Sequence, residues 1–270
     1  ERRELLVADT GNHSIRRVSP SGLVSVFAGT GAPGFQEGST AEAQFNEPSG
    51  ITGDASGQLF VADRNNSHRI RKIDGDGVVS TYATVRESYY GPGLSQVEMD
   101  GAGRLFVGNW SLVTLVTARE QGRVIAGSEN SGEIYGWSAP IGLAVDAENR
   151  VLASTLNKIV RIVIDGPQED FAGGGAGFAD GQRLLAQFEM PRDLTVMPDG
   201  SVFVADATRV RRIGADGFVR TYAGAGIPGY RNGPGPSAMF QMATGVAVDP
   251  LGNLYVADTP NHCIRVVSKD

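Results

Sequence analysis

Residues 45–83 read FNEPSGITGDASGQLFVADRNNSHRIRKIDGDGVVSTYA and contain four short runs of alternating apolar and polar residues. The runs cover residues 50–54, 59–63, 69–73 and 78–83, and clusters of Gly, Asp, Asn and Ser separate them. Such clusters mark tight turns, so the stretch predicts a small antiparallel sheet with strands a, b, c and d. A sheet of this size cannot bury both faces by itself, so further copies must pack against it.

The pattern of strands b and c occurs six times along the chain. The copies start at residues 5, 59, 105, 151, 202 and 254, and they begin LLVAD, LFVAD, LFVGN, VLAST, VFVAD and LYVAD. Their spacing of 46 to 54 residues is typical of propeller blades and differs from that of helical solenoids. The first copy has no strand a and the last has no strand d. Either two blades have three strands, or the sequence is part of a longer chain.

The composition fits one large globular domain with many tight connections. Of 270 residues, 41% are hydrophobic and 37 are Gly, a residue that tight turns favour. The net charge of −6 disfavours nucleic acid as a general partner, although a local basic patch stays open. The chain has no run of about 18 apolar residues that would predict a membrane span. It has no signal sequence, but it begins without Met and could have lost one, and we favour an extracytoplasmic or secreted location.

The repeated combination of P-x-G-[IL]-x-x-D, L-[FY]-V-A-D and I-R-[RK]-[IV] resembles the NHL-repeat family of six-bladed β-propellers. The Asn-His-Leu run that names the family corresponds here to residues 12–14, 67–69 and 261–263, which read NHS, SHR and NHC. The resemblance implies an all-β fold, with residues 1–270 forming one six-bladed propeller of four-stranded antiparallel blades. Members of the family include protein- and RNA-binding modules, receptor domains and a few enzymes, so the resemblance leaves the function open.

An Asp at the end of strand b and an Arg early in strand c recur together in four copies. The pairs are Asp9 with Arg16, Asp63 with Arg71, Asp206 with Arg211, and Asp258 with Arg265. The third copy has Asn109 and Thr114 instead and loses both charges at once, which favours a structural ion pair at the b–c connection. The fourth copy, aligned with Ser154 and Arg161 at these places, keeps only the Arg and fits less well.

The three histidines, His13, His68 and His262, lie in b–c connections of neighbouring copies. Equivalent residues on successive blades diverge, so we expect these rings to cap turns and not to share a zinc ion. The resemblance includes a peptide-amidating lyase with zinc-binding histidines at the first residues of strand a, facing the central channel. Lactonase-like six-bladed propellers instead bind calcium at the channel through Glu, Asn and Asp. The matching positions here are Ser49, Ser95, Ile141, Arg192 and Thr244. The sequence therefore predicts no cofactor and leaves a divalent cation at the channel open.

Two stretches, residues 29–34 and 224–229, match the pattern G-x-G-x-x-G of dinucleotide-binding loops. Such a site needs a helix that begins at the last glycines, whereas an aromatic residue follows both stretches here. A related stretch covers residues 173–181, so the three copies indicate a structural loop. Each loop leads through a possible helical turn to a Phe that we expect to pack between blades; these are Phe45, Phe188 and Phe240.

The third and fourth copies depart most from the repeat, and departures from an internal rule favour a functional role. The connections there carry five large aromatic residues, namely Tyr89, Tyr90, Trp110, Tyr135 and Trp137. Because d–a and b–c connections of a propeller emerge on one face, these rings would share a sector of it. They could plug gaps between blades or form a recognition surface. Together with Arg192, they are the candidate ligand-binding residues.

These observations favour a non-catalytic binding or scaffold propeller. Its predicted partner is a protein, a peptide or a glycan, recognised on the face of the b–c and d–a connections. The alternative is a metal-dependent lyase or hydrolase that acts at the mouth of the central channel. RNA binding would require a basic face on this acidic chain.

Overall fold

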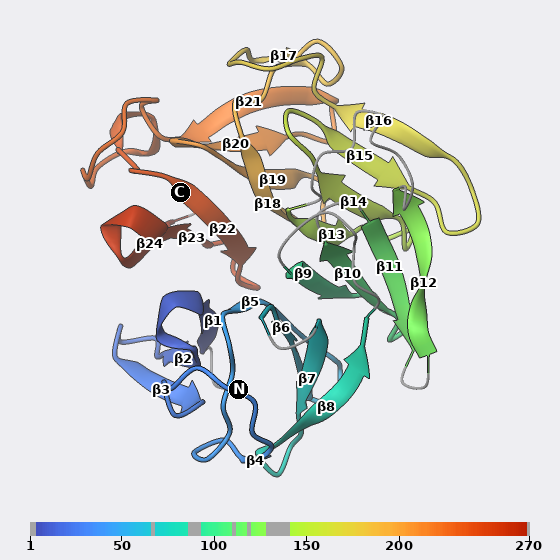
Figure 1. Ribbon diagram of the computed structural model, residues 1–270. Coiled ribbons are helices and arrows are strands. Elements are labelled where there is room, and N and C mark those ends of the chain that lie inside the picture. Colours follow the sequence, from blue (N-terminus) through green and yellow to red (C-terminus); the bar gives the residue numbers. More distant parts are fainter. Residues whose placement is uncertain are drawn as a thin grey trace. The chain divides into compact units, whose positions relative to one another are not determined.

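The computed structural model describes residues 4–65, 68–85, 93–109, 112–117, 120–127 and 141–268. These residues form antiparallel sheets and three short 3₁₀ turns, η1 (Thr10–Asn12), η2 (Gly235–Ser237) and η3 (Thr259–Asn261). None of the helices in this described part is long and apolar enough to span a membrane. The chain divides into two compact units, Glu1–Tyr135 and Gly136–Asp270, with three sheets in each (Figure 1).

The first unit contains blades 1 to 3. Blade 1 consists of β1 (Leu5–Asp9), β2 (Ser14–Val18) and β3 (Val24–Ala28). Blade 2 consists of β5 (Pro48–Gly53), β6 (Leu59–Asp63), β7 (Arg69–Ile73) and β8 (Val78–Thr84), and β4 (Gly38–Ser39) pairs with β8 at its outer edge. Blade 3 consists of β9 (Leu94–Met99), β10 (Leu105–Asn109), β11 (Leu112–Thr117) and β12 (Glu120–Gly127).

The second unit contains blades 4 to 6. Blade 4 consists of β13 (Leu143–Val145), β14 (Val151–Ser154), β15 (Ile159–Ile162) and β16 (Gln168–Ala172). Blade 5 consists of β18 (Pro191–Val196), β19 (Val202–Asp206), β20 (Arg209–Ile213) and β21 (Phe218–Ala223), with β17 (Gly181–Gln182) beyond β21. Blade 6 consists of β22 (Ala243–Val248), β23 (Leu254–Asp258) and β24 (Cys263–Val267).

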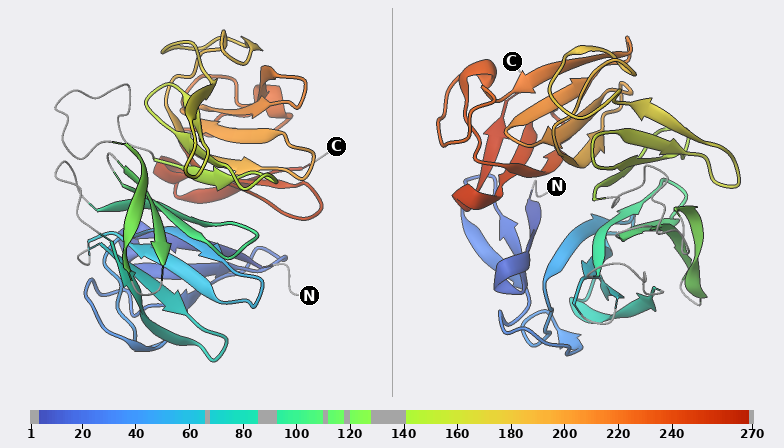
Figure 2. Two further views of the ribbon diagram at one scale, coloured as in Figure 1. Left: turned by 90° about the vertical axis from the view of Figure 1, so that its right-hand side faces the viewer. Right: turned by 45° about the horizontal axis from the view of Figure 1, so that its top comes forward.

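The predicted six-bladed β-propeller is confirmed, with a different number of strands in some blades. Blades 3 and 4 have the four expected strands, whereas blades 1 and 6 have three each. Blades 2 and 5 have five strands because the loop that enters each blade adds a two-residue strand outside strand d. The loop with β17 lies at the top of Figure 1 and is also seen, in yellow, at the top of the left view in Figure 2.

Strand register corrects the alignment of the fourth copy. Val61 pairs with Arg71 in blade 2, and the residue that pairs equivalently with Ala153 in blade 4 is Val160. Thr155, the residue after Ser154, therefore corresponds to Asp63, and Val160 corresponds to Arg71. Arg161 lies one residue further along strand c. Blade 4 thus lacks both charges, as blade 3 does, and the exception to the joint loss disappears.

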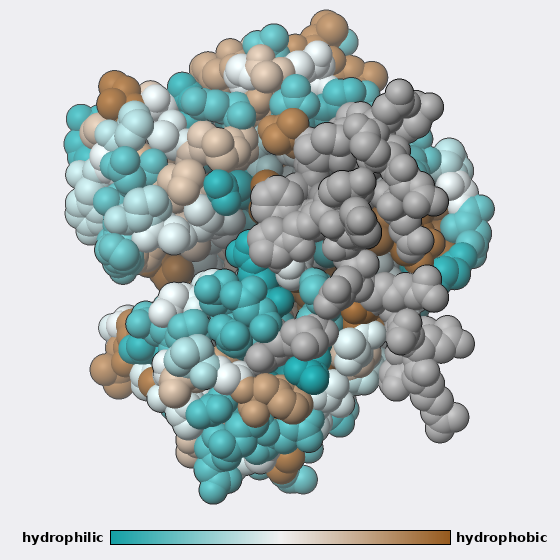
Figure 3. Space-filling view, in the orientation of Figure 1, coloured by the Kyte–Doolittle hydropathy of each residue, from teal (hydrophilic) through white to brown (hydrophobic). Residues whose placement is uncertain are grey.

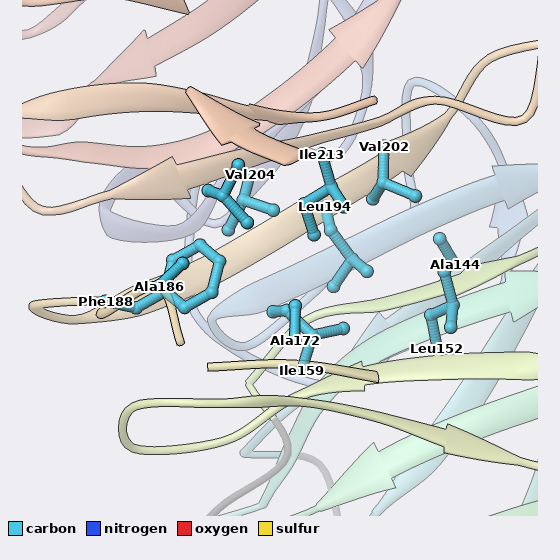
Figure 4. Packing of buried hydrophobic residues seen from close by; sticks show 11 residues of the cluster. Ala144, Leu152, Ile159, Ala172, Ala186, Phe188, Leu194, Val202, Val204 and Ile213 are labelled. Carbon is cyan, nitrogen blue, oxygen red and sulfur yellow. The ribbon is translucent and has the colours of Figure 1, made fainter. Parts of the chain in front are cut away.

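The hydrophobic cores lie between neighbouring blades of each unit. The core between blades 4 and 5 joins Leu152 and Ile159 of one sheet with Leu194 and Val204 of the next, and Phe188 of the entering loop packs against it (Figure 4). Phe45 and Phe240 occupy the same place in the cores between blades 1 and 2 and between blades 5 and 6. All three rings are buried, which confirms their predicted packing.

The predicted helical turn before each of these rings is also present. It is a single turn, closed by a hydrogen bond from a backbone N–H to the carbonyl four residues earlier. The bonds run from Ala43 to Ser39 at 2.9 Å, from Ala186 to Gln182 at 2.8 Å and from Ala238 to Pro234 at 3.0 Å. The turn reverses the loop so that the following Phe points into the core.

Candidate functional site

Three blades contain the same polar cluster, which we name the loop clasp. It consists of the Asp that ends strand b, the Arg in strand c and the loop that enters the blade from the preceding one. The members are Asp63, Arg71 and residues 29–47 in blade 2; Asp206, Arg211 and residues 173–190 in blade 5; and Asp258, Arg265 and residues 224–242 in blade 6. Each Arg Nη1 lies 3.0 to 3.1 Å from the Asp carboxylate, and both side chains are buried.

Hydrogen bonds join each clasp to its loop. In blade 2, Arg71 donates to the carbonyl oxygens of Gln44 at 2.9 Å and Gln36 at 2.8 Å. The backbone N–H of Asn46 donates to Asp63 Oδ1 at 2.7 Å. The Arg of blades 5 and 6 makes the equivalent pair of bonds, to Gln187 and Ala179 and to Met239 and Arg231, at 2.9 to 3.1 Å. A buried guanidinium is costly unless its donors are paired, and here the loop carbonyls and the Asp accept from Nη1 and Nη2. The Nε of Arg71 and that of Arg211 are buried without a partner among the described residues.

Two aromatic rings of the loop also lie against each clasp guanidinium. Arg71 Cζ is 4.8 Å from the ring centre of Phe35 and 5.3 Å from that of Phe45. These distances permit cation–π attraction, which is stronger where water is excluded. The other clasps repeat the arrangement, with Arg211 over Phe178 and Phe188 and with Arg265 over Tyr230 and Phe240.

The chemistry of the loop clasp supports a structural role. Burial raises the pKa of the Asp206 carboxyl, while the N–H of Met190 and the Arg211 guanidinium act in the opposite direction. Asp206 Oδ1 accepts hydrogen bonds from the N–H groups of Glu189 and Met190, and Oδ2 accepts from Arg211. With these contacts made inside the protein, the carboxylate holds the loop and does not face a ligand.

Blades 1 and 3 differ from the blades with a loop clasp, because no described loop covers the pair in blade 1 and the charges are absent in blade 3. In blade 1, Arg16 lies 3.7 Å from Asp9, and the two side chains are 31% and 26% exposed. In blade 3, the buried Asn109 accepts a hydrogen bond from the N–H of Leu112 at 3.0 Å. Among the described residues, the three buried Asp–Arg pairs are those that a loop covers.

The histidines lie at turns, where their backbone is left-handed. The φ angles of His13, His68 and His262 are 50°, 56° and 54°, and His13 and His262 end the turns η1 and η3. His13 Nδ1 accepts a hydrogen bond from the N–H of Glu47 at 3.2 Å. Within the ranges that the structure describes, no three His, Cys, Asp or Glu side chains are grouped to hold a metal ion.

Arg192 stands at the head of strand a in blade 5. Its Nη2 donates to the Met190 sulfur at 3.4 Å, and its carbonyl accepts from Ser154 Oγ at 2.5 Å. No carboxylate of the described residues forms an ion pair with its guanidinium. At equivalent heads, Ser49 Oγ donates to the Leu94 carbonyl at 2.9 Å, and the hydroxyls of Thr244 and Thr259 are hydrogen-bonded to each other. Among these positions, Arg192 offers a charge that an anionic group of a ligand could use.

The five aromatic candidates, Tyr89, Tyr90, Trp110, Tyr135 and Trp137, lie outside the described residues, so their shared sector stays a prediction. A different set of apolar residues is exposed in the second unit. Leu156 is 62% exposed, Leu184 55% and Leu185 74%. We name these three side chains the apolar loop surface. Sequence reasoning did not single them out, although the loops differ here: residues 184–185 are LL, and the matching residues 41–42 and 236–237 are AE and PS.

The apolar loop surface is formed by two connections that touch. Leu156 belongs to the b–c turn of blade 4, and Leu184 and Leu185 belong to the loop that enters blade 5. A Cβ added to Gly173 of that loop would lie 2.6 Å from the Asn157 carbonyl oxygen. The N–H of Gly174 donates to the Ala186 carbonyl at 2.7 Å. The first contact shows that the two connections that carry the leucines lie close together.

Comparisons with known proteins agree with the repeats and the fold. A family model described as NHL repeat matches residues 45–73 and 240–267. NHL repeat-containing protein 2 of Bos taurus is 30% identical over 97% of this chain and 36% of its own length. The first curated relatives are matched over only 26% to 36% of their length, so the chain corresponds to a part of each of them.

Solved structures with the same fold have different functions. An auxiliary nutrient binding protein from Bacteroides thetaiotaomicron has a TM-score of 0.74 and 17% identity, with 98% of this chain and 66% of that chain covered. Virginiamycin B lyase from Staphylococcus aureus has a TM-score of 0.58 and 16% identity, with 94% and 73% covered. At these identities the likeness shows the fold alone. That fold is the six-bladed β-propeller. With its repeats and its relatives, the chain belongs to the NHL-repeat family.

Proposed function

We propose that this propeller is a non-catalytic binding module for a protein partner. Its recognition surface lies on the face where b–c and d–a connections emerge, and it includes the apolar loop surface. The observation that carries the proposal is the exposure of Leu184 and Leu185. The loop that enters blade 2 makes the same turn with Ala41 and Glu42, so the turn does not require leucines. Exposed apolar residues that the fold does not need are typical of interfaces.

The energetics favour a partner with apolar and acidic groups. Burial of a leucine side chain contributes about 1.5–3 kcal/mol, so three leucines could supply much of a binding energy. Arg183 precedes the pair and lies over the ring of Phe171 at 4.7 Å. Neither Arg183 nor Arg192 forms an ion pair with a carboxylate in the described part of the chain. Leucines offer no hydrogen bonds to sugar hydroxyls, which favours a protein or peptide over a glycan.

The proposal is tested by replacing the two leucines with the residues at the same positions of the loop that enters blade 2. We expect Leu184→Ala with Leu185→Glu to change the free energy of unfolding by less than about 0.5 kcal/mol, because both side chains are exposed. Binding to the physiological partner should weaken at least tenfold. The partner would be isolated from extracts of the source organism with the parent protein, and its affinity for each variant measured by calorimetry.

The matched control is the reverse exchange, Ala41→Leu with Glu42→Leu, which changes the same turn in blade 2. It should leave the affinity unchanged. Equal affinity of parent and both variants for the partner would contradict a role of the apolar loop surface.

The aromatic candidates give a second test of the same function. If Trp110, Tyr135 and Trp137 are anchors, replacing each by Ala should leave the melting temperature almost unchanged and weaken partner binding by about 2 kcal/mol or more. If the rings plug gaps between blades, each replacement should destabilise the protein by about 3–5 kcal/mol. Thermal melts and calorimetry on the same variants separate the two outcomes. A large loss of stability in all three would remove these residues from the recognition surface.

A further inference from the structure

The second residue of strand a differs in chemistry between blades. Ser49 in blade 2, Arg192 in blade 5 and Thr244 in blade 6 each follow the first residue of strand a, which pairs with the last residue of strand b. Ser49 Oγ donates to the Leu94 carbonyl at 2.9 Å, and Thr244 Oγ1 donates to the Ala257 carbonyl at 3.4 Å. The hydroxyl groups are thus used inside the protein, whereas blade 5 has a guanidinium at this position.

The guanidinium of Arg192 has no strong acceptor within the described part of the chain. Its Nη2 donates to the Met190 sulfur at 3.4 Å, and a thioether is a weak acceptor. The carboxylate of the next residue, Asp193, is directed to blade 6, where its Oδ2 accepts from the N–H of Val246 at 2.9 Å. Arg192 therefore keeps donors from which a carboxylate of a ligand could accept.

The other arginines of the second unit have partners for their charge. Most of them form ion pairs with carboxylates; these are Arg150, Arg161, Arg209, Arg211, Arg212, Arg220 and Arg265. Arg231 donates to the Ser237 carbonyl at 2.8 Å, and Arg183 lies over the ring of Phe171 at 4.7 Å. Among the described residues of this unit, Arg192 is the arginine whose guanidinium meets neither a carboxylate, a carbonyl nor a ring.

A buried serine of blade 4 fixes the backbone of Arg192. Ser154 is 0% exposed, and its Oγ accepts from the N–H of Gly142 at 2.8 Å and donates to the Arg192 carbonyl at 2.5 Å. The same place in strand b is Ala62 in blade 2 and Ala205 in blade 5, so the sheet does not require a hydroxyl group there. Ser154 thus joins two strands a and holds the start of β18, a rigid element suited to present a ligand-binding side chain.

We propose that Arg192 and Met190 bind a carboxylate of the partner together with the apolar side chain next to it. The inference rests on the proposed function, which supplies a protein partner. A guanidinium binds a carboxylate through two parallel N–H···O bonds. Met190 is 41% exposed, and its flexible thioether packs against apolar groups of varied shape. A phosphate group fits less well, because its charge of about −1.5 to −2 exceeds that of a single Arg.

The carboxylate site is separate from the apolar loop surface. Leu184 and Leu185 belong to the loop that carries β17, where hydrophobic side chains reach the surface (Figure 3). Arg192 belongs to β18 (Pro191–Val196). Substitution of the leucines therefore leaves the guanidinium in place, and substitution of Arg192 leaves the leucines in place.

Short blocked peptides are the probes for this site. N-acetyl-Leu-Asp-amide would be titrated into the isotope-labelled protein, and binding followed by the Arg192 Nε–Hε signal and the Met190 methyl signal. We expect saturable shifts of both signals with a dissociation constant in the millimolar range. N-acetyl-Leu-Asn-amide, which lacks the charge, should bind at least tenfold more weakly. N-acetyl-Leu-Gly, which has a free terminal carboxylate, shows whether a side chain or a chain end is the preferred source.

Variants of the protein test the role of the guanidinium, with the Met190 methyl signal as the measurement. Arg192→Gln should weaken binding of the Asp peptide at least tenfold, and Arg192→Lys should weaken it as well, because Lys has no planar fork. Arg231→Gln, which changes an arginine whose donors are used by a carbonyl, should leave the affinity unchanged. The proposal is overturned if the Asp peptide shifts neither signal at millimolar concentration, or if the Asn peptide or Arg192→Gln gives equal affinity.

The isolated partner separates failure of this site from failure of the proposed function. Loss of partner binding in the leucine variant with unchanged binding in Arg192→Gln would overturn the carboxylate site alone. Weaker partner binding in Arg192→Gln with unchanged binding in the leucine variant would support the carboxylate site and contradict the role of the apolar loop surface.

Discussion

Replacement of Arg71 by Ala is expected to lower the free energy of unfolding by about 3–5 kcal/mol, because it leaves the buried Asp63 carboxylate without its cation. The carbonyl oxygens of Gln36 and Gln44 lose their donor in the same variant, and the loop that enters blade 2 is released. Urea denaturation followed by circular dichroism measures the change. Asp63→Ala should have a similar effect, because Arg71 is then the buried charge without a partner.

The equivalent change in blade 1 is the matched control. Arg16→Ala should lower the free energy of unfolding by less than about 1 kcal/mol, because the pair with Asp9 is partly exposed to solvent and no described loop covers it. Equal losses for Arg71→Ala and Arg16→Ala would mean that the loop bonds do not contribute, contrary to the role assigned to the clasp.

Replacement of Phe188 by Ala is expected to cost about 3–5 kcal/mol as well, because it empties a large buried site between blades 4 and 5. Phe178 of the same loop lies over Arg209 at 3.7 Å but is 46% exposed, so Phe178→Ala should cost only about 1 kcal/mol. Chemical denaturation of both variants gives the comparison. If Phe178→Ala were as destabilising as Phe188→Ala, the outer ring would be essential to the core.

The fold was predictable because the chain repeats itself. Six copies of one strand pattern showed which residues are equivalent, and the loss of both charges in blade 3 pointed to the pairing of Asp63 with Arg71. The packing of Phe45, Phe188 and Phe240 followed from the same comparison. The strands β4 and β17 were not predicted, because two residues are too few to show an alternating pattern.

Blade 4 shows how residue type can mislead an alignment. Ser154 and Arg161 resemble the polar and basic residues of the other copies, but the pairing of Ala153 with Val160 puts Thr155 and Val160 at the clasp positions. A shift of one residue along a strand moves every side chain to the opposite face. The aligned copies already place Thr155, the fifth residue of VLAST, where Asp63 stands in LFVAD. The turn between strands b and c differs in length among the blades, so only the position of Val160 in strand c needed the structure.

The apolar loop surface could not be predicted either, because the sequence pattern of the loop does not show which residues are buried. The run LLAQF at residues 184–188 has apolar residues at four of its five positions, and nothing in the pattern says which are buried. The turn places Ala186 and Phe188 in the core and leaves Leu184 and Leu185 outside. Only the comparison with AEAQF at residues 41–45, where a Glu takes the place of the second Leu, carries a signal that this position is exposed.

Amide hydrogen exchange on the intact protein tests the loop clasp most directly, because it reports on equivalent residues of three blades at once. The N–H groups of Thr81 and Thr221 are covered by their loops, whereas Val26, which pairs with Arg16 as Thr81 pairs with Arg71, lies on an edge of β3 that no described strand covers. We predict slow exchange at Thr81 and Thr221 and fast exchange at Val26. Glu37→Ala should speed exchange at Thr81 and leave Thr221 unchanged. Equal protection of all three amides, or no response of Thr81 to Glu37→Ala, would contradict the clasp.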